Sequence, residues 1–196
     1  RTKVRVTVTA VNMLTATQFA NLSTAQIRAL STDQAVNLES TDVQALSGSQ
    51  VAALTTANIT ALASTDVGYF TANQIAALTT AQVRAIDSGD LPVLTGSTLA
   101  ALSSAHIAAL SSEQLVGMAS DQLQALSADQ LAGLTTYQMS SLQTADLNML
   151  TVSQYQNLST RQIAALDSHQ VVSMESLDLQ TLSSAQIRAL SRCSRR

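Results

Sequence analysis

Residues with catalytic or metal-binding chemistry are few in this sequence and lie far apart. The chain has two histidines, His106 and His169, which are 63 residues apart in the sequence, and one cysteine, Cys193. A zinc site needs several ligands at short, characteristic spacings, and a single thiol forms no disulfide within its own chain. The spacing therefore excludes the common metal motifs. We expect His106 to stand in for a helix-capping residue and His169 to lie on the surface.

Serine and aspartate are abundant but form no recognisable catalytic or calcium-binding motif. The sequence has no G-x-S-x-G turn, no phosphate-binding glycine loop, no EF-hand loop and no glycine-rich aspartate repeat of the β-roll type. Rows of hydroxyls would also suit ice binding, but mixed Ser and Thr fit helix capping better than a flat threonine lattice. We therefore predict no catalytic residue, no cofactor-binding residue, no metal ligand and no cofactor.

The sequence instead repeats one octapeptide along nearly its whole length. The stretch Leu22–Leu30 reads Leu-Ser-Thr-Ala-Gln-Ile-Arg-Ala-Leu and returns almost unchanged at Leu182–Leu190. Counting every eighth residue from Leu14 to Leu182 gives 22 octads, of which 18 begin with Leu. We call this first residue the head, at offset 0. A fixed short period is the signature of a stacked repeat architecture.

The residue order within an octad matches the start of a helix. Offset 1 is Ser or Thr in 15 octads, offset 4 is Gln in 14, and offset 5 is a large apolar residue in 21. With Ser23 as N-cap, Gln26 is the third helical residue, and the two form a capping box. Leu22 and Ile27 then occupy the positions of a hydrophobic staple. The pattern predicts a new helix every eight residues, with offsets 3 and 6 facing solvent.

Two other architectures compete with this interpretation. In one continuous helix, eight residues would leave each leucine about 80° out of line with the previous one, so no single apolar stripe would form. A β-solenoid is the stronger rival, but Ala, Gln and Leu are poor strand formers and the apolar offsets do not alternate. The predicted fold class is an all-α solenoid of very short helices, with a β-solenoid as the alternative.

Several octads depart from the pattern in ways that affect the predicted helices. Five both lack the hydroxyl at offset 1 and carry Asp at offset 4, which suggests that the cap moves by one residue in those octads; the aspartates are Asp42, Asp66, Asp90, Asp146 and Asp178. Pro92, in one of these octads, predicts a local change of helical turn without a domain boundary. In another octad, His106 replaces the usual Gln.

Length and charge bound the domain organisation and the kinds of partner. Residues 1–13 form a non-repeat lead that reads as an edge strand, part of an upstream β region or a disordered end; residues 14–190 form the octad array, and residues 191–196 a basic tail. The octads carry four arginines against 13 acidic residues, a net charge of −9. Such an acidic surface argues against nucleic acid, which requires clustered Lys and Arg. No apolar run approaches the ~18 residues that cross a bilayer.

The tract Leu158–Leu166, Leu-Ser-Thr-Arg-Gln-Ile-Ala-Ala-Leu, resembles the octapeptide arrays of very large bacterial surface or secreted proteins. Some of those proteins are described as adhesin-like or haem-utilisation proteins. The resemblance covers residues 14–190 and rests on scaffold residues, so it is specific for the repeat and not for an activity. It implies an extracellular or cell-surface location and a long spacer or adhesive stalk. The chain begins with Arg1, so we expect a fragment or processed segment.

For function, the sequence favours a non-catalytic structural spacer or presenting stalk. The alternative is a protein- or peptide-binding solenoid, whose partner would be a protein or a cell-surface ligand. Neighbouring repeats of the same chain are the first expected partners, since an isolated octad buries too little to fold alone. Two, three or four octads per superhelical turn all suit the pattern, and two is slightly favoured because facing helices bury both apolar rows most simply.

Overall fold

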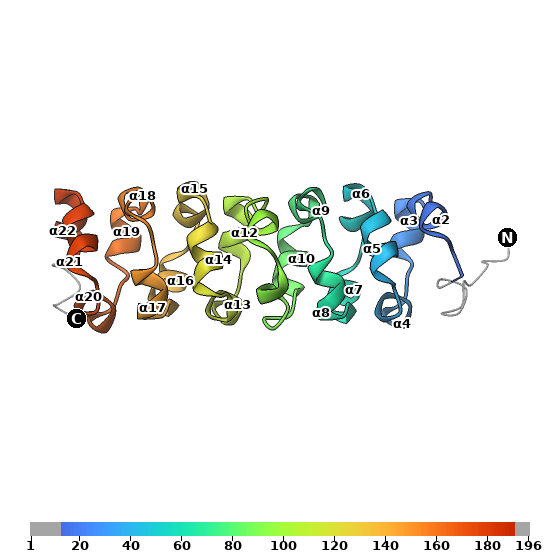
Figure 1. Ribbon diagram of the computed structural model, residues 1–196, viewed down its shortest axis with the longest axis horizontal. Coiled ribbons are helices and arrows are strands. Elements are labelled where there is room, and N and C mark those ends of the chain that lie inside the picture. The colour runs from blue at the N-terminus through green and yellow to red at the C-terminus, as the bar shows by residue number, and fades with distance from the viewer. Residues whose placement is uncertain (1–12, 191–196) are drawn as a thin grey trace. The chain divides into compact units, whose positions relative to one another are not determined.

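The computed structural model describes residues 13–190, and short helices dominate this part of the chain (Figure 1). The α-helices are four to seven residues long, at most one for each octad, and none of the described residues lies in a strand. The all-α solenoid is therefore confirmed, and the β-solenoid is excluded for residues 13–190. The chain divides into two compact units, residues 1–101 and 102–196.

The helices of the first unit are α2 (Ala16–Ala20), α3 (Thr24–Arg28), α4 (Thr32–Val36), α5 (Ser40–Ala45), α6 (Gly48–Val51), α7 (Thr56–Ala61), α8 (Ser64–Gly68), α9 (Ala72–Ala77), α10 (Thr80–Ala85), the 3-10 helix η1 (Leu91–Val93) and α11 (Gly96–Leu99). The helices of the second unit are α12 (Ser104–Ala109), α13 (Ser112–Gly117), α14 (Ser120–Ala125), α15 (Ala128–Ala132), α16 (Thr136–Ser141), α17 (Thr144–Asn148), α18 (Val152–Asn157), α19 (Thr160–Ile163), α20 (Ser168–Val172), α21 (Ser176–Thr181) and α22 (Ser184–Leu190).

Helices with a Ser or Thr N-cap and Gln at offset 4 begin where the capping residues predict. In α3 the N-cap Ser23 has an extended backbone (φ −69°, ψ 156°), and its hydroxyl accepts a hydrogen bond from the Gln26 N–H at 3.3 Å. The Gln26 side chain in turn accepts from the Ser23 N–H at 2.9 Å. The same reciprocal pair recurs in most octads, for example at Thr79 and Gln82. The capping box therefore restarts the helix in one octad after another.

The helices end without the left-handed glycine that often closes a helix. No residue in the described range 13–190 has a positive φ. In α7, for example, the next head Leu62 (ψ 143°) and the next N-cap Ala63 (ψ 151°) are both extended. Such a corner consists of two extended residues and needs no special residue type.

Three octads make one coil, because within each unit a helix packs on the third helix after it. Helices pack in three columns in the first unit, namely α2, α5, α8 and η1; α3, α6, α9 and α11; and α4, α7 and α10. The second unit has the same plan, with columns α12, α15, α18 and α21; α13, α16, α19 and α22; and α14, α17 and α20. The slight preference for two octads per turn is wrong, because within each unit a helix packs on the third helix along the chain, 24 residues away, and not on the second.

The core consists of the heads and the offset-5 residues. At offset 5, Ile75, Val83 and Leu131 are fully buried, and the heads Leu78 and Leu126 are almost so. Burying one large aliphatic side chain stabilises the fold by about 1.5–3 kcal/mol. Each coil contributes three such pairs, so its stability comes from side chains that only neighbouring coils can cover.

The octads with Asp at offset 4 show one difference from the prediction. The N-cap stays at offset 1, at Glu39, Ala63, Gln143 and Glu175, and its side chain makes no capping hydrogen bond. The predicted one-residue shift of the cap is therefore wrong. It does not occur because the coil-to-coil packing fixes the register, and a shifted helix start would turn the offset-5 residue out of the core.

The local change of turn around Pro92 is confirmed. Its octad forms η1 in place of an α-helix, and the fully buried Leu91 keeps its place in the core. The predictions for the lead and the basic tail concern residues outside the described range, except Met13. No helix in residues 13–190 is long and apolar enough to span a bilayer.

Candidate functional site

The two histidines occupy separate positions, each as predicted. His106 is buried in α12, where its Nδ1 accepts the Ser103 N–H at 3.2 Å and completes a capping box. His169 is exposed in the first turn of α20. Within residues 13–190, no group of three or more His, Cys, Asp or Glu side chains is arranged to hold a metal ion.

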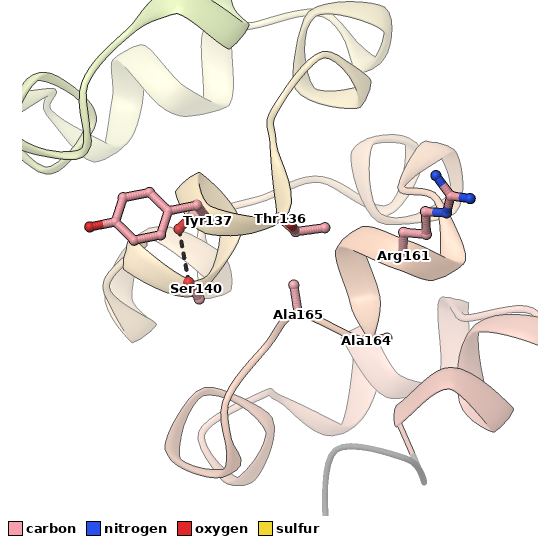
Figure 2. A pocket seen from close by; sticks show the side chains of 6 residues that line it. All are labelled: Thr136, Tyr137, Ser140, Arg161, Ala164 and Ala165. Atoms are coloured by element: carbon pink, nitrogen blue, oxygen red, sulfur yellow. Dashed lines mark hydrogen bonds between the residues drawn. The ribbon is translucent and has the colours of Figure 1, made fainter. Parts of the chain in front are cut away.

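A shallow concavity lies between α16 and α19 in the second unit (Figure 2). Thr136, Tyr137, Ser140, Arg161, Ala164 and Ala165 line it. Figure 2 shows the Tyr137 and Arg161 side chains on opposite sides of it, with the small Ala165 between them. The Ser140 hydroxyl donates to the Tyr137 carbonyl at 2.8 Å, so it is not poised as a nucleophile. The concavity offers an exposed aromatic ring and a guanidinium, which suit binding better than catalysis.

The most regular polar arrangement is the row of glutamines at offset 4. These side chains are buried, as at Gln74, Gln82 and Gln138, which are each 2 % exposed. A buried amide must satisfy both its acceptor and its donor, because an unpaired polar group in the interior costs about 1–3 kcal/mol. The acceptor is satisfied within the octad, where Oε1 of Gln74 accepts the Thr71 N–H at 2.8 Å.

The donor of each amide reaches the coil beneath. Nε2 of Gln74 donates to the carbonyls of Val43 at 2.7 Å and Leu46 at 2.8 Å, which are 31 and 28 residues earlier. The Val43 carbonyl lies in the last turn of α5, where it also accepts the Leu46 N–H at 3.3 Å, and Leu46 is the C-cap of that helix. The glutamine therefore caps the start of its own helix and the end of a helix in the previous coil.

The same bridge recurs in both units, always to the two carbonyls at these spacings. It is made by Gln50 to Phe19 and Leu22, Gln82 to Val51 and Leu54, Gln138 to Ile107 and Leu110, Gln154 to Leu123 and Leu126, Gln162 to Leu131 and Leu134, Gln170 to Met139 and Leu142, and Gln186 to Tyr155 and Leu158. We call each such contact between successive coils a joint.

Sequence reasoning identified these glutamines as caps but missed the joint. The missed signal is the choice of Gln over Glu. Glu would serve equally well in a capping box, yet it never occurs at offset 4, whereas Gln occurs there in 14 octads. The Gln amide both accepts the N-cap N–H and donates to carbonyls, and an ionised Glu cannot donate. The absence of Glu therefore reports a second, donor-requiring contact.

A second set of bonds crosses the coils on the outside, in the opposite direction. Polar side chains at offset 6 donate to a carbonyl 25 residues later, from Thr60 to Ala85 at 2.9 Å, Gln124 to Met149 at 3.1 Å and Asn148 to Ser173 at 3.1 Å. Successive coils in each unit are thus joined by hydrogen bonds near the core and, at some octads, also at the surface.

Joints with aspartate in place of glutamine are different. Asp66 and Asp178 are both 7 % exposed, and Asp178 Oδ2 is buried with no hydrogen-bond partner among the described residues. Burial raises the pKa of the Asp42, Asp66 and Asp178 carboxyls above the ordinary value, because desolvation disfavours the charged form. Backbone N–H groups at the N-caps lower the pKa of each, and Glu39 and Glu175 raise the pKa of Asp42 and Asp178 further.

The described geometry can be set beside known families. The profile of a family described as the ALTTAQ repeat matches residues 83–120 and 139–175. This chain is a repeat array. The letters of the ALTTAQ repeat appear in order at Ala77–Gln82, and they span the small offset-7 residue, the head, the N-cap and the bridging glutamine. A comparison with curated proteins gives no match.

Proposed function

We propose that the chain is a non-catalytic structural spacer or presenting stalk within a larger bacterial surface or secreted protein. One observation carries the proposal, namely that the joints are made between successive coils from the same few residue types. Each coil is therefore stabilised by its neighbours, and the array lengthens by adding octads without a new core. The resemblance to octapeptide arrays of surface proteins supports the extracellular setting.

The spacer role is tested by changing the number of coils. Inserting a second copy of residues 126–149, which make up one coil, should leave the protein folded and raise its maximum dimension in small-angle X-ray scattering. A second inserted copy should raise that dimension by the same increment. A dimension that stays constant or falls as coils are added would contradict the proposal.

A binding scaffold is the second candidate, and the concavity at Tyr137 and Arg161 favours it. Tyr137 is 73 % exposed, and the Arg161 guanidinium has no ion-pair partner among residues 13–190. An exposed aromatic ring beside an unpaired cation suits a carboxylate-bearing ligand. Screening peptides and glycans against the wild type and a Tyr137→Ala/Arg161→Ala variant tests this candidate, and binding that is equal for both proteins would count against it.

A further inference from the structure

At Asp66 and Asp178, an ionised carboxylate would face backbone carbonyls of the coil beneath without a hydrogen to donate to them. At a glutamine joint, Nε2 supplies the hydrogens for two carbonyls of the coil beneath, as Gln74 does for Val43 and Leu46. An ionised carboxylate has no hydrogen to donate. Asp66 and Asp178 occupy the same octad position as Gln74. When their carboxyls are ionised, the carbonyls 31 and 28 residues earlier in the chain accept no hydrogen bond from them.

Asn58 shows that a side chain of this length reaches the coil beneath. It is 1 % exposed at offset 4, and its Oδ1 accepts the Thr55 N–H at 3.1 Å. Its Nδ2 donates to the Leu30 carbonyl at 3.2 Å, 28 residues earlier. Asparagine and a protonated aspartate have the same length, and each has an acceptor and a donor. The matching carbonyl is that of Leu38 for Asp66 and that of Leu150 for Asp178.

The joint at Asp178 contains a second buried acid–base group. The hydroxyl of the fully buried Tyr155 donates to the Leu147 carbonyl at 2.9 Å. Leu147 is as far before Asp178 as Val43 is before Gln74, so the tyrosine takes the first of the two carbonyls that a glutamine would bridge here. The second carbonyl, that of Leu150, remains for Asp178. Burial and the nearby Asp178 and Glu175 carboxyls raise the pKa of Tyr155.

The charged groups around these aspartates are all acidic. Helix α8 carries Asp66 and packs against α5 and η1. The acidic groups of α5 are Asp42 and its N-cap Glu39. Those at the start of η1 are its N-cap Asp90 and the nearby Asp87. Helix α21, which carries Asp178, packs against α18, whose titratable group is Tyr155; Glu175 is the N-cap of α21 itself. None of these packing elements brings Lys, Arg or His. They therefore supply no cation that would stabilise the ionised forms.

We propose that Asp66 and Asp178 form proton-operated joints. The neutral carboxyl donates to the carbonyl at the spacing that Asn58 bridges, and it ties its coil to the coil beneath; the ionised carboxylate leaves that joint open. The array is then held together more firmly in acidic surroundings. This property goes beyond the proposed spacer role and does not depend on it.

The sign of the pH dependence follows from the raised pKa values. Between the ordinary Asp value of about 3.9 and the higher folded value, the folded chain binds more protons than the unfolded chain. Stability therefore rises as the pH falls from neutral through the folded pKa, and the gain is complete below the unfolded value. Surface carboxylates with favourable contacts have lowered pKa values, and their contribution to stability is lost as the pH falls. The pH dependence of stability must therefore be compared between the wild type and its variants.

The test measures the folding equilibrium constant of the whole chain by denaturant titration at a series of pH values from about 7.5 down to about 3.9, the ordinary Asp value. Asp66→Asn and Asp178→Asn supply the donor permanently. Each should raise the constant at the highest pH by about fivefold, the effect of one net hydrogen bond. The double variant should also lose most of the gain that the wild type shows on acidification. No gain at the highest pH, or an unchanged pH dependence, would overturn the proposal.

Two further variants separate the donor from the mere loss of a buried charge. Asp178→Leu removes the charge and offers no donor, so it should gain less than Asp178→Asn; an equal gain would overturn the role of the donor. Asp129→Asn is the control and changes an exposed aspartate of α15. It should change the folding equilibrium constant by less than about twofold and leave the pH dependence of that constant unchanged.

The chain has no tryptophan, so tyrosine fluorescence reports the joint directly. Replacing the exposed Tyr69 and Tyr137 with Phe leaves Tyr155 as the reporter. Its emission should change as the pH falls from about 7.5 towards about 3.9 and Asp178 gains a proton. The change should vanish in Asp178→Asn and persist in Asp66→Asn. A change that persists in Asp178→Asn would overturn the assignment to this joint.

Discussion

The Nε2 amide of Gln82 donates a 2.8 Å hydrogen bond to the carbonyl of Leu54, which lies 28 residues earlier and one coil below. The same amide donates to Val51 at 2.8 Å, while its Oε1 accepts the Thr79 N–H at 2.8 Å. One side chain therefore satisfies backbone groups at the start of one helix and at the end of another. In a fold of such short helices, most backbone N–H and C=O groups lie near a helix end, where intrahelical hydrogen bonds are missing. The glutamine amide supplies partners to such groups at both kinds of helix end.

Adding a hydroxyl at an uncapped helix start should stabilise the fold. The N-cap Ala63 of α8 has the extended backbone of the serine caps (φ −72°, ψ 151°) but no side-chain acceptor for the Asp66 N–H. Ala63→Ser should raise the free energy of unfolding by about 0.5–1 kcal/mol. Denaturant titration measures the change. Ala128→Ser, one residue inside α15, is the control and should bring no gain, since Ser127 already caps that helix.

Small residues at offset 7 set how closely the coils approach. A Cβ added at Gly133 would lie 2.6 Å from the Ser104 carbonyl oxygen, which belongs to the backbone of the coil beneath. Gly133→Ala should therefore lower the free energy of unfolding by about 1–3 kcal/mol. At Gly68 an added Cβ would meet Val93 at an ordinary 3.4 Å, so Gly68→Ala should stabilise α8 by about 0.5–1 kcal/mol. Thermal melts of the two variants should shift in opposite directions, and shifts of the same sign would contradict the packing at Gly133.

Tyr155 should ionise at unusually high pH. Burial, with the carboxyls of Asp178 and Glu175, raises the pKa of Tyr155 above the ordinary value of about 10. In the Tyr69→Phe/Tyr137→Phe variant, ultraviolet absorbance should show no phenolate near that pH while the circular dichroism remains helical. The same variant in denaturant should titrate normally. A folded protein that titrates at the ordinary value would place Tyr155 outside the core.

Much of the fold follows from the sequence because its decisive interactions are local. Ser23 and Gln26 are close in sequence, and their capping box forms wherever the octad occurs. Such short-range contacts set one helix per octad. His106 was identified as a capping substitute for the same reason, because its Nδ1 takes the place of a glutamine oxygen within one octad.

The number of octads per coil could not be read from the same pattern, because it depends on contacts between residues far apart in the sequence. Two, three or four octads per turn would all place Gln74 at a helix start, and only the coil geometry brings its amide to Val43 and Leu46. The effect of Asp at offset 4 was misjudged for a related reason. Asp66 was interpreted as part of a shifted cap, whereas long-range packing holds the N-cap at Ala63.

The most direct test of the amide joint compares two Gln→Glu substitutions in the first unit. Gln82→Glu keeps the capping acceptor but replaces the donor with a charge facing two buried carbonyls, so it should lower the free energy of unfolding by about 3 kcal/mol. Gln26→Glu is the matched control, because Gln26 caps α3 in the same way but is exposed, and no carbonyl of another coil accepts from it among residues 13–190. It should change stability by less than about 0.5 kcal/mol. Denaturant titrations that give the same small change for both variants would contradict the joint.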